Sequence, residues 1–197
     1  MEHFDPGQLR KKLHALPDWK RVTFMAACCE RMLPNYVSFS SETYFGDAQT
    51  LKQALSEVWR WIETNHLPDD IDSLVRECDR QAPDTADFSS IYTSAALDAA
   101  NSIAMTLEAM SDATEDRAIE VASIARDTVD LFVQQWSDLD PNSPGLEKLI
   151  IEAPLMQVEL RRQRRCLEQL KELPDERDQV VTEIRASFSD RSLPPTP

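Results

Sequence analysis

The distribution of glycine and proline is the feature of this sequence that most restricts its fold. The 197 residues include only three glycines but twelve prolines. Tight turns between β-strands favour glycine, often as Asn-Gly or Asp-Gly, whereas the prolines here stand at the edges of helix-like segments. No convincing run alternates apolar with polar residues. The sequence therefore predicts an all-α protein.

Residues 16–47 predict two consecutive helices that carry most of the amino-terminal core. Apolar residues recur there every three or four positions, which is the spacing of one helix face: Trp19, Val22, Ala26, Cys29 and Leu33. Pro34 is predicted to end the first helix, because a proline ring clashes with the preceding turn. A second short helix then ends at Gly46, and Asp47 is a good N-cap for the helix that follows.

Further periodic segments predict helices over 6–15, 47–65, 68–83 and 89–110, and from 146 to about 188 with breaks near Pro154 and Pro174. Between them, Ser111 or Thr114 is predicted to cap another helix, which is followed by a loop at 141–145. The segment 89–110 is rich in Ala and Ser, and Asp98 is its only charge before Glu108. Neighbouring helices can approach such a segment on several sides, so it is predicted to be the central helix. We expect a single-domain bundle of about seven to nine helices over residues 1–188, followed by a proline-rich tail over 189–197.

The four cysteines are predicted to be buried and reduced, because free cysteine behaves as a small apolar residue. Cys28 and Cys29 are adjacent and cannot readily bond each other, and no Cys-x-x-Cys pattern suggests a redox or zinc site. The amino terminus lacks the basic and apolar regions of a secretion signal. No apolar segment reaches the ~18 residues of a membrane span. We expect a cytoplasmic protein without membrane contact.

The net charge of −14 is concentrated in the middle of the chain. Residues 67–142 contain 17 acidic and 4 basic side chains, whereas residues 1–66 contain 8 of each and residues 143–197 contain 10 acidic and 9 basic. This field repels nucleic acid, whose phosphates require clustered Lys and Arg. It attracts a basic partner. A solvated acidic surface that only maintains solubility is the alternative interpretation.

The sequence also contains one pronounced basic cluster, formed by Arg161, Arg162, Arg164 and Arg165. Glu159 and Glu168 lie three or four positions from members of this cluster, where ion pairs form along a helix. We therefore interpret the cluster as an exposed face or a partner surface and predict no nucleic-acid binding.

Metal and cofactor sites are predicted to be absent. Glu63 and His66 have the Glu-x-x-His spacing of di-iron bundles, but those sites need two such motifs and further glutamates. His66 is expected to interact with the last carbonyl groups of its helix instead. Acidic pairs suited to Mg²⁺ occur at Asp127 with Asp130 and at Asp138 with Asp140. No phosphate-binding loop accompanies them.

The stretch from Trp19 to Asp47 also carries a long motif, W-x-x-V-x-F-M-A-x-x-C-E-R-M-x-P-N-Y-x-x-F-x-x-x-T-x-F-G-D. This motif resembles the YjaG-like family of bacterial proteins, a domain of unknown function. The resemblance continues through residues 86–88, Tyr92 and Asp98-Ala99, and it covers roughly residues 9–188. It implies an all-helical cytoplasmic protein and brings no assigned chemistry.

A candidate polar network or ligand site combines two separated parts of that resemblance: Glu30, Arg31, Asp47, Tyr92 and Asp98. A carboxylate on an almost uncharged helix needs a partner, and the guanidinium of Arg31 offers a planar set of donors. We hypothesise that Arg31 and Asp98 meet, with Tyr92 or Glu30 completing the network. A buried network that fixes the helix register is the structural alternative.

No pattern assigns catalytic residues, so two functional hypotheses follow. The first is a non-enzymatic helical interaction or ligand-binding module whose acidic surface engages a basic protein partner; homodimerisation through the carboxy-terminal helices is a further candidate. The alternative is a small-molecule enzyme in which Asp98, beside Arg31, acts as acid or base.

Overall fold

The structure, a computed structural model, describes residues 1–137, 144–174 and 177. Within these residues the chain forms eight α-helices and no strand. The helices are α1 (Pro6–His14), α2 (Asp18–Thr43), α3 (Ala48–Thr64), α4 (Ile71–Gln81), α5 (Thr93–Glu108), α6 (Glu115–Trp136), α7 (Leu146–Glu152) and α8 (Pro154–Glu172). The prediction of an all-α fold is confirmed. The proline-rich tail and part of the predicted loop at 141–145 lie outside the described residues.

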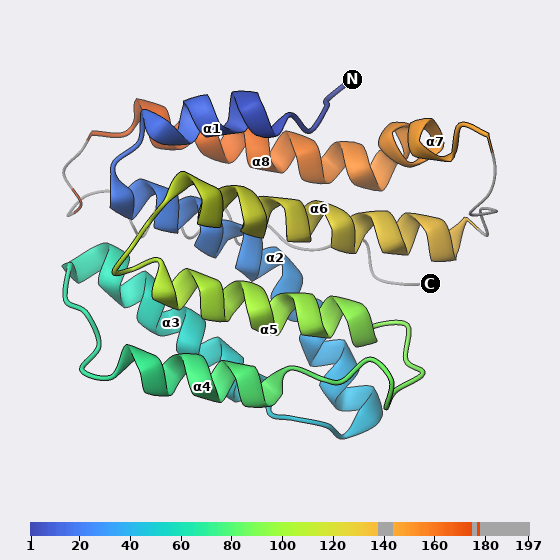
Figure 1. Ribbon diagram of the computed structural model, residues 1–197, viewed down its shortest axis with the longest axis horizontal. Coiled ribbons are helices and arrows are strands. Elements are labelled where there is room, and N and C mark those ends of the chain that lie inside the picture. Colours follow the sequence, from blue (N-terminus) through green and yellow to red (C-terminus); the bar gives the residue numbers. More distant parts are fainter. Residues whose placement is uncertain (138–143, 175–176, 178–197) are drawn as a thin grey trace.

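The helices form two groups that share α2 (Figure 1). In this view α1, α7 and α8 lie above α6, while α3, α4 and α5 lie below it, and α2 passes behind α6 and α5. Helix α6 packs against α1, α2, α5 and α8, and α5 packs against α2, α3, α4 and α6. The fold therefore places α2 and α6 between the two groups, where their side chains can join distant parts of the chain.

The predicted central helix has the expected small-residue packing. Buried alanines line α5, and they let its backbone approach the neighbouring helices closely: Ala95, Ala96, Ala99, Ala100 and Ala104. Helix α2 shares the central position, since it packs against α3, α5, α6 and α8. Most of the buried apolar side chains form one continuous core, and a smaller cluster joins the end of α6 to α7 and α8.

The prediction that Pro34 divides α2 is wrong, because the helix continues through it from Asp18 to Thr43. Proline removes one backbone hydrogen bond and crowds the preceding turn, at a cost of about 3 kcal/mol. Pro34 is exposed, whereas Leu33, Tyr36 and Phe39 are buried on both sides of it. Burial of this continuous apolar face offsets the cost of the proline.

The end of α2 turns sharply into α3. Tyr44 is the left-handed C-cap of α2, with a φ angle of 58°. Gly46 is also left-handed, and a Cβ atom there would overlap the Tyr36 hydroxyl group, so only glycine fits without a shift. Asp47 caps α3, as predicted, by accepting a hydrogen bond from the backbone N–H of Gln49.

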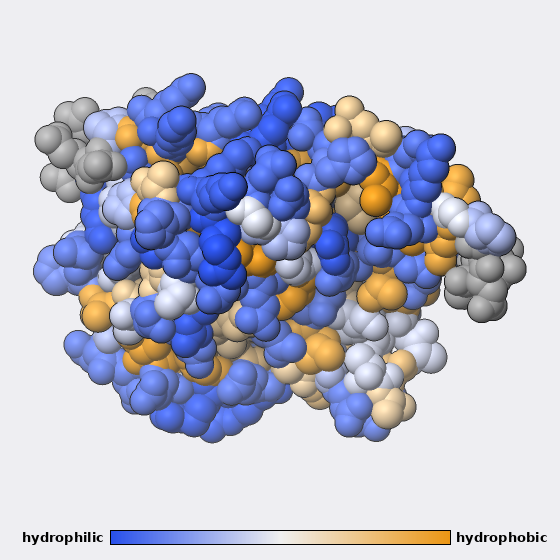
Figure 2. All heavy atoms as spheres, turned by 45° about the horizontal axis from the view of Figure 1, so that its top comes forward, coloured by the Kyte–Doolittle hydropathy of each residue, from blue (hydrophilic) through white to orange (hydrophobic). Residues whose placement is uncertain are grey.

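None of the helices in the described part of the chain has the length and apolar character that crossing a membrane requires. Figure 2 shows one face of the molecule, on which hydrophilic side chains predominate and apolar side chains occur in scattered patches. Exposed large apolar residues are distributed over several elements, including Tyr44, Trp136 and Leu149.

Candidate functional site

The five predicted site residues do not form a single cluster. Arg31 pairs with Glu159 of α8 and not with Asp98. Its Nε donates to Glu159 Oε2 at 2.9 Å, and its Nη2 donates to Glu159 Oε1 at 2.7 Å. This two-point geometry is the strongest form of an arginine–carboxylate contact. The hypothesis that Arg31 and Asp98 meet is therefore wrong, because the ion pair of Arg31 is with Glu159.

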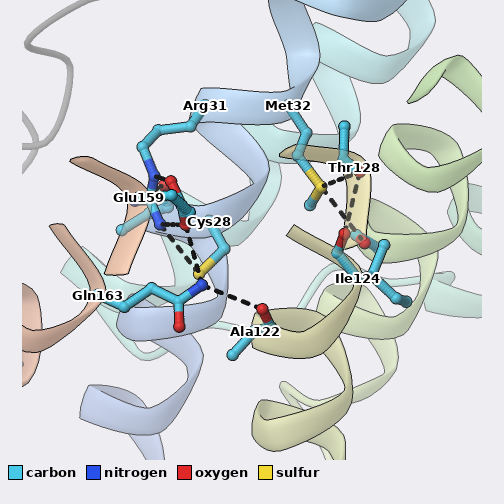
Figure 3. A network of polar contacts seen from close by, with 10 residues as sticks. Cys28, Arg31, Met32, Ala122, Ile124, Thr128, Glu159 and Gln163 are labelled. Atoms are coloured by element: carbon cyan, nitrogen blue, oxygen red, sulfur yellow. Dashed lines mark hydrogen bonds and ion pairs between the residues drawn. The ribbon is translucent and has the colours of Figure 1, made fainter. Parts of the chain in front are cut away.

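The Arg31–Glu159 pair belongs to a network that joins three helices (Figure 3). Arg31 also donates to the Ala27 carbonyl oxygen at 2.6 Å and contacts the Cys28 sulfur at 3.4 Å. From α8, Gln163 Nε2 donates to Glu159 Oε1 at 2.9 Å and to the carbonyl oxygen of Ala122 on α6 at 3.0 Å. We call these residues of α2, α6 and α8 the arginine network.

Burial makes the arginine network electrostatically strong. The side chains of Arg31 and Glu159 are only 9% and 6% exposed. Burial opposes the charge on Glu159, but the Arg31 guanidinium and its hydrogen bonds outweigh burial and lower the pKa of Glu159. Burial likewise opposes the charge on Arg31, yet the Glu159 carboxylate raises the Arg31 pKa above its usual value. Both groups are therefore charged at neutral pH.

The thiol beside this pair is not activated. Burial raises the pKa of Cys28 to about 11, although the Arg31 charge acts in the opposite direction. Reactive cysteines need a lowered pKa and access to solvent, and Cys28 is fully buried. Because every polar member of the network is satisfied and no nucleophile is ionised, the arginine network is suited to holding helices in register.

Asp98 belongs to a second contact between α5 and α6. The Thr128 hydroxyl group donates to Asp98 Oδ2 at 2.7 Å. Thr128 also lies 3.0 Å from the Ile124 carbonyl oxygen and 3.9 Å from the Met32 sulfur (Figure 3). Burial raises the pKa of Asp98, the Thr128 hydrogen bond opposes the rise, and Asp127 adds to it.

The remaining three predicted residues have separate neighbours. Glu30 accepts a hydrogen bond from the indole N–H of Trp59 at 2.8 Å. Asp47 is exposed and caps α3. Tyr92 stands at the start of α5, and its ring lies edge-on to Phe132 at 6.0 Å between centroids. A common ligand for the five residues stays a prediction.

The sequence contained a signal for Glu159 that the prediction did not use. Glu159 and Gln163 recur at three- and four-residue spacing within the apolar stripe of α8, together with Met156, Leu160, Cys166, Leu167 and Leu170. A charged residue on such a stripe points into the core. Glu159 therefore forms its ion pair with Arg31, while Arg162 of the same helix adds a weaker attraction.

Other predicted contacts have mixed outcomes. His66 Nδ1 lies 2.9 Å from the Thr64 carbonyl oxygen, which confirms its expected place at the helix end. In the basic cluster of α8, Arg164 pairs with Glu168 at 3.5 Å, as expected, and also with Glu2 at 2.8 Å. Asp127 pairs with Arg126, whereas Asp130 accepts from Gln134. The acidic pair 138/140 lies outside the described residues.

The exposed carboxylates around α4 form the second candidate feature. Residues 67–92 contain seven acidic side chains and two basic ones. Both arginines are paired within the segment, Arg76 with Asp70 at 4.0 Å and Arg80 with Glu77. Among the described residues, the other carboxylates of the segment form no ion pair, and all five are exposed: Asp69, Asp72, Asp79, Asp84 and Asp87. We call residues 67–92 the acidic surface.

Comparison with known proteins places the chain among relatives without an assigned role. A family model described as "Protein of unknown function (DUF416)" matches residues 8–193. The Escherichia coli "Uncharacterized protein YjaG" is 32% identical over 119 residues, which cover 60% of this chain and 61% of that protein. An "Uncharacterized protein" of Haemophilus influenzae is 28% identical over 137 residues, or 66% of this chain and 70% of the relative. The match thus spans about three-fifths of the YjaG protein.

A solved structure has the same fold. The crystal structure of a DUF416 family protein from Shewanella baltica matches with a TM-score of 0.83 at 29% identity, and the match covers 90% of this chain and 91% of that chain. These relatives confirm the predicted resemblance to YjaG-like proteins.

Proposed function

Because this chain belongs to the DUF416 family, a group of proteins of unknown function, its role has to be inferred from its own surface, and we propose that it is a helical interaction module. The acidic surface binds a basic protein partner. The buried polar networks hold α2, α5, α6 and α8 in register, and α4 packs against one of these helices, α5. The observation that carries this proposal is the set of five exposed, unpaired carboxylates around α4.

The charge distribution next to α4 supports the proposal. No lysine or arginine occurs between Arg80 and Arg117, so the loop after α4 and the whole of α5 contribute no positive charge. Helix α4 also lies at the edge of the helix group, away from α6 (Figure 1). Its carboxylates therefore face water and a partner rather than the core. Such a field accelerates the association of a basic partner and does so less at high salt.

The enzyme alternative loses its premise. It required Arg31 beside Asp98, whereas the Arg31 guanidinium is engaged by Glu159 and by the Ala27 carbonyl oxygen. The four buried free cysteines support a reducing compartment. We therefore include a cytoplasmic location in the proposal.

Binding of fluorescein-labelled deca-lysine, followed by fluorescence anisotropy, tests the proposed surface. We expect the full chain to bind at low salt and to lose affinity steeply at moderate salt. The triple variant Asp69→Asn/Asp72→Asn/Asp79→Asn should bind about tenfold more weakly, since each exposed charge contact contributes up to about 1 kcal/mol.

A charge-matched control separates the acidic surface from the net charge. The variant Glu147→Gln/Glu152→Gln/Glu168→Gln removes three exposed carboxylates from α7 and α8. Its affinity for deca-lysine should change much less than that of the α4 variant. Equal losses in the two variants would refute a localised surface, and an absence of binding at low salt would refute the proposal as a whole.

A further inference from the structure

A second feature that recognises a cation lies where α2 begins and α3 ends. The guanidinium carbon of Arg177 lies 4.9 Å from the centroid of the Trp61 ring and 6.0 Å from that of Trp19. Guanidinium groups bind to tryptophan faces at such distances through cation–π attraction. Both tryptophans are buried, at 5% and 4% exposure. Both also belong to the main hydrophobic core.

Two oxygen acceptors lie at one edge of the same guanidinium group. Arg177 Nη1 donates to the Trp61 carbonyl oxygen at 3.4 Å and to Asn65 Oδ1. Trp61 lies in the last turn of α3, where the helix dipole favours a cation. Asp18 adds a negative charge that acts on Arg177. We call Trp19, Trp61, Asn65 and Asp18 the arginine slot.

We propose that the arginine slot is a binding site for an arginine side chain of the basic partner, and that Arg177 occupies it as an internal competitor. This inference rests on the proposed function and adds the mode of recognition. The slot and the acidic surface are neighbours along the chain, because Asn65 is followed after three residues by Asp69 and Asp70. A basic segment on the acidic surface can therefore place one arginine on Trp61.

The contacts of Arg177 allow exchange. A cation–π contact at a partly exposed site changes affinity by only about two- to fivefold. The end of α8 is anchored independently, because Lys20 Nζ donates to the Leu173 carbonyl oxygen at 2.7 Å and Lys20 is only 2% exposed. Arg177 can leave the slot while this bond holds α8 in place.

The slot also favours arginine over lysine. A planar guanidinium group stacks on an indole ring and still directs its N–H groups to acceptors at its edge, whereas an ammonium group cannot do both in the same way. Here the ring of Trp61 lies under the guanidinium, and the acceptors of Trp61 and Asn65 lie within hydrogen-bonding reach of one Nη atom. The acidic surface alone would not make this distinction.

Anisotropy titrations with labelled deca-arginine and deca-lysine test the slot in the full chain. The variant Arg177→Ala should bind deca-arginine about fivefold more tightly than the wild type, because the competitor is removed. Its affinity for deca-lysine should change less than about twofold. Arg165→Ala is the matched control, since it removes one exposed arginine from α8. This control should raise the affinity for both peptides slightly and equally.

Two further variants test the slot oxygens. Asn65→Gly suits the left-handed backbone at this position, where φ is 59°, and Asp18→Asn alters an exposed side chain. Each should cancel most of the gain of Arg177→Ala for deca-arginine. A melting curve of each variant establishes that the fold is retained.

The outcomes separate the slot from the acidic surface. If Arg177→Ala changes deca-arginine binding no more than Arg165→Ala does, or if both oxygen variants leave the gain intact, the slot is refuted. The proposed function survives that result as long as deca-lysine still binds through the acidic surface. If neither peptide binds the wild type at low salt, both proposals fail.

Discussion

The buried charges of Arg31 and Glu159 compensate each other. Arg31 and Glu159 are nearly inaccessible and bond each other at two points. Removing one member of such a pair leaves an uncompensated buried charge, whereas replacing both by apolar groups is often neutral or stabilising. The arginine network therefore specifies which helices meet more than it adds to stability.

Glu159→Gln should destabilise the protein by about 3–5 kcal/mol, because Arg31 stays buried without a counter-charge. Urea unfolding at neutral pH measures the loss. The double variant Arg31→Met/Glu159→Leu should recover most of it. A Glu159→Gln variant as stable as the wild type would show that Arg31 reaches water or another acceptor.

The same pair predicts a response to acid. The folded-state pKa of Glu159 is lowered from its ordinary value of 4.5, so its contribution to stability is present above that value. It is lost as the pH falls through the lower folded-state pKa. The double variant should lack this part of the acid sensitivity.

The contribution of Asp98 to stability should depend on pH in the opposite direction. Its folded-state pKa is raised by burial, so the folded protein binds this proton more tightly than the unfolded chain, and stability falls as the pH rises through the raised value. Asp98→Asn should therefore raise the urea midpoint at neutral pH and remove this pH dependence. Thr128→Val should instead lower stability by about 1–3 kcal/mol, because the carboxylate loses its donor. A lower midpoint for Asp98→Asn would contradict this account of the carboxylate.

The candidate site was only partly predictable from the sequence. Asp98 stood out because it is a lone carboxylate among Ala and Ser, and the structure gives it a donor, as expected. The partner of Arg31 could not be predicted, because Glu159 is 128 positions away and the sequence offers 35 acidic residues as partners for Arg31. Helix periodicity indicates which side chains point inward, but the crossing of α2 over α8 decides which of them meet.

At the scale of helices, the sequence predicted an end correctly where the signal is local and incorrectly where tertiary packing overrides it. Asp47 caps α3 as predicted, and α8 begins at Pro154, where the sequence predicted a break. Of the two candidate caps Ser111 and Thr114, Thr114 caps α6. Each acts on the backbone at its own helix end, so no distant partner is involved. Pro34 failed as a stop signal because its effect competes with tertiary burial of the same helix.

Replacing Pro34 by Ala should stabilise the protein. Alanine restores a backbone donor in the interior of α2 and relieves a cost of about 3 kcal/mol, while the freer unfolded chain takes back about 1 kcal/mol. A net gain of about 2 kcal/mol is expected in urea unfolding. No cavity complicates the result, because Pro34 is exposed. A loss of stability would mean that the proline contributes contacts of its own.

At the scale of the whole molecule, the four cysteines report on global unfolding. All four are free and at most 1% exposed. Burial raises the pKa of Cys28 to about 11 and that of Cys78 to about 12, so the reactive thiolate is scarce at neutral pH. A thiol reagent should modify the native protein only at the rate of unfolding and all four thiols in denaturant. Rapid modification of one thiol in the native protein would reveal local opening.

The whole molecule also separates its charges. The arginines of α8 include Arg164, which is paired with Glu2 and Glu168, whereas most carboxylates of the acidic surface have no cation beside them. The acidic surface, with seven acidic and two basic side chains, contributes −5 to the net charge of −14. A basic partner is the class of molecule that this asymmetry favours.

Amide NMR shifts during titration with deca-lysine test this central claim most directly. We expect the largest shifts at residues 67–92, with weaker ones near Asn65 and Asp18. Residues of α7 and α8 should change little, and added salt should reverse every shift. Shifts spread evenly over the surface, or concentrated on α8, would contradict binding through the acidic surface.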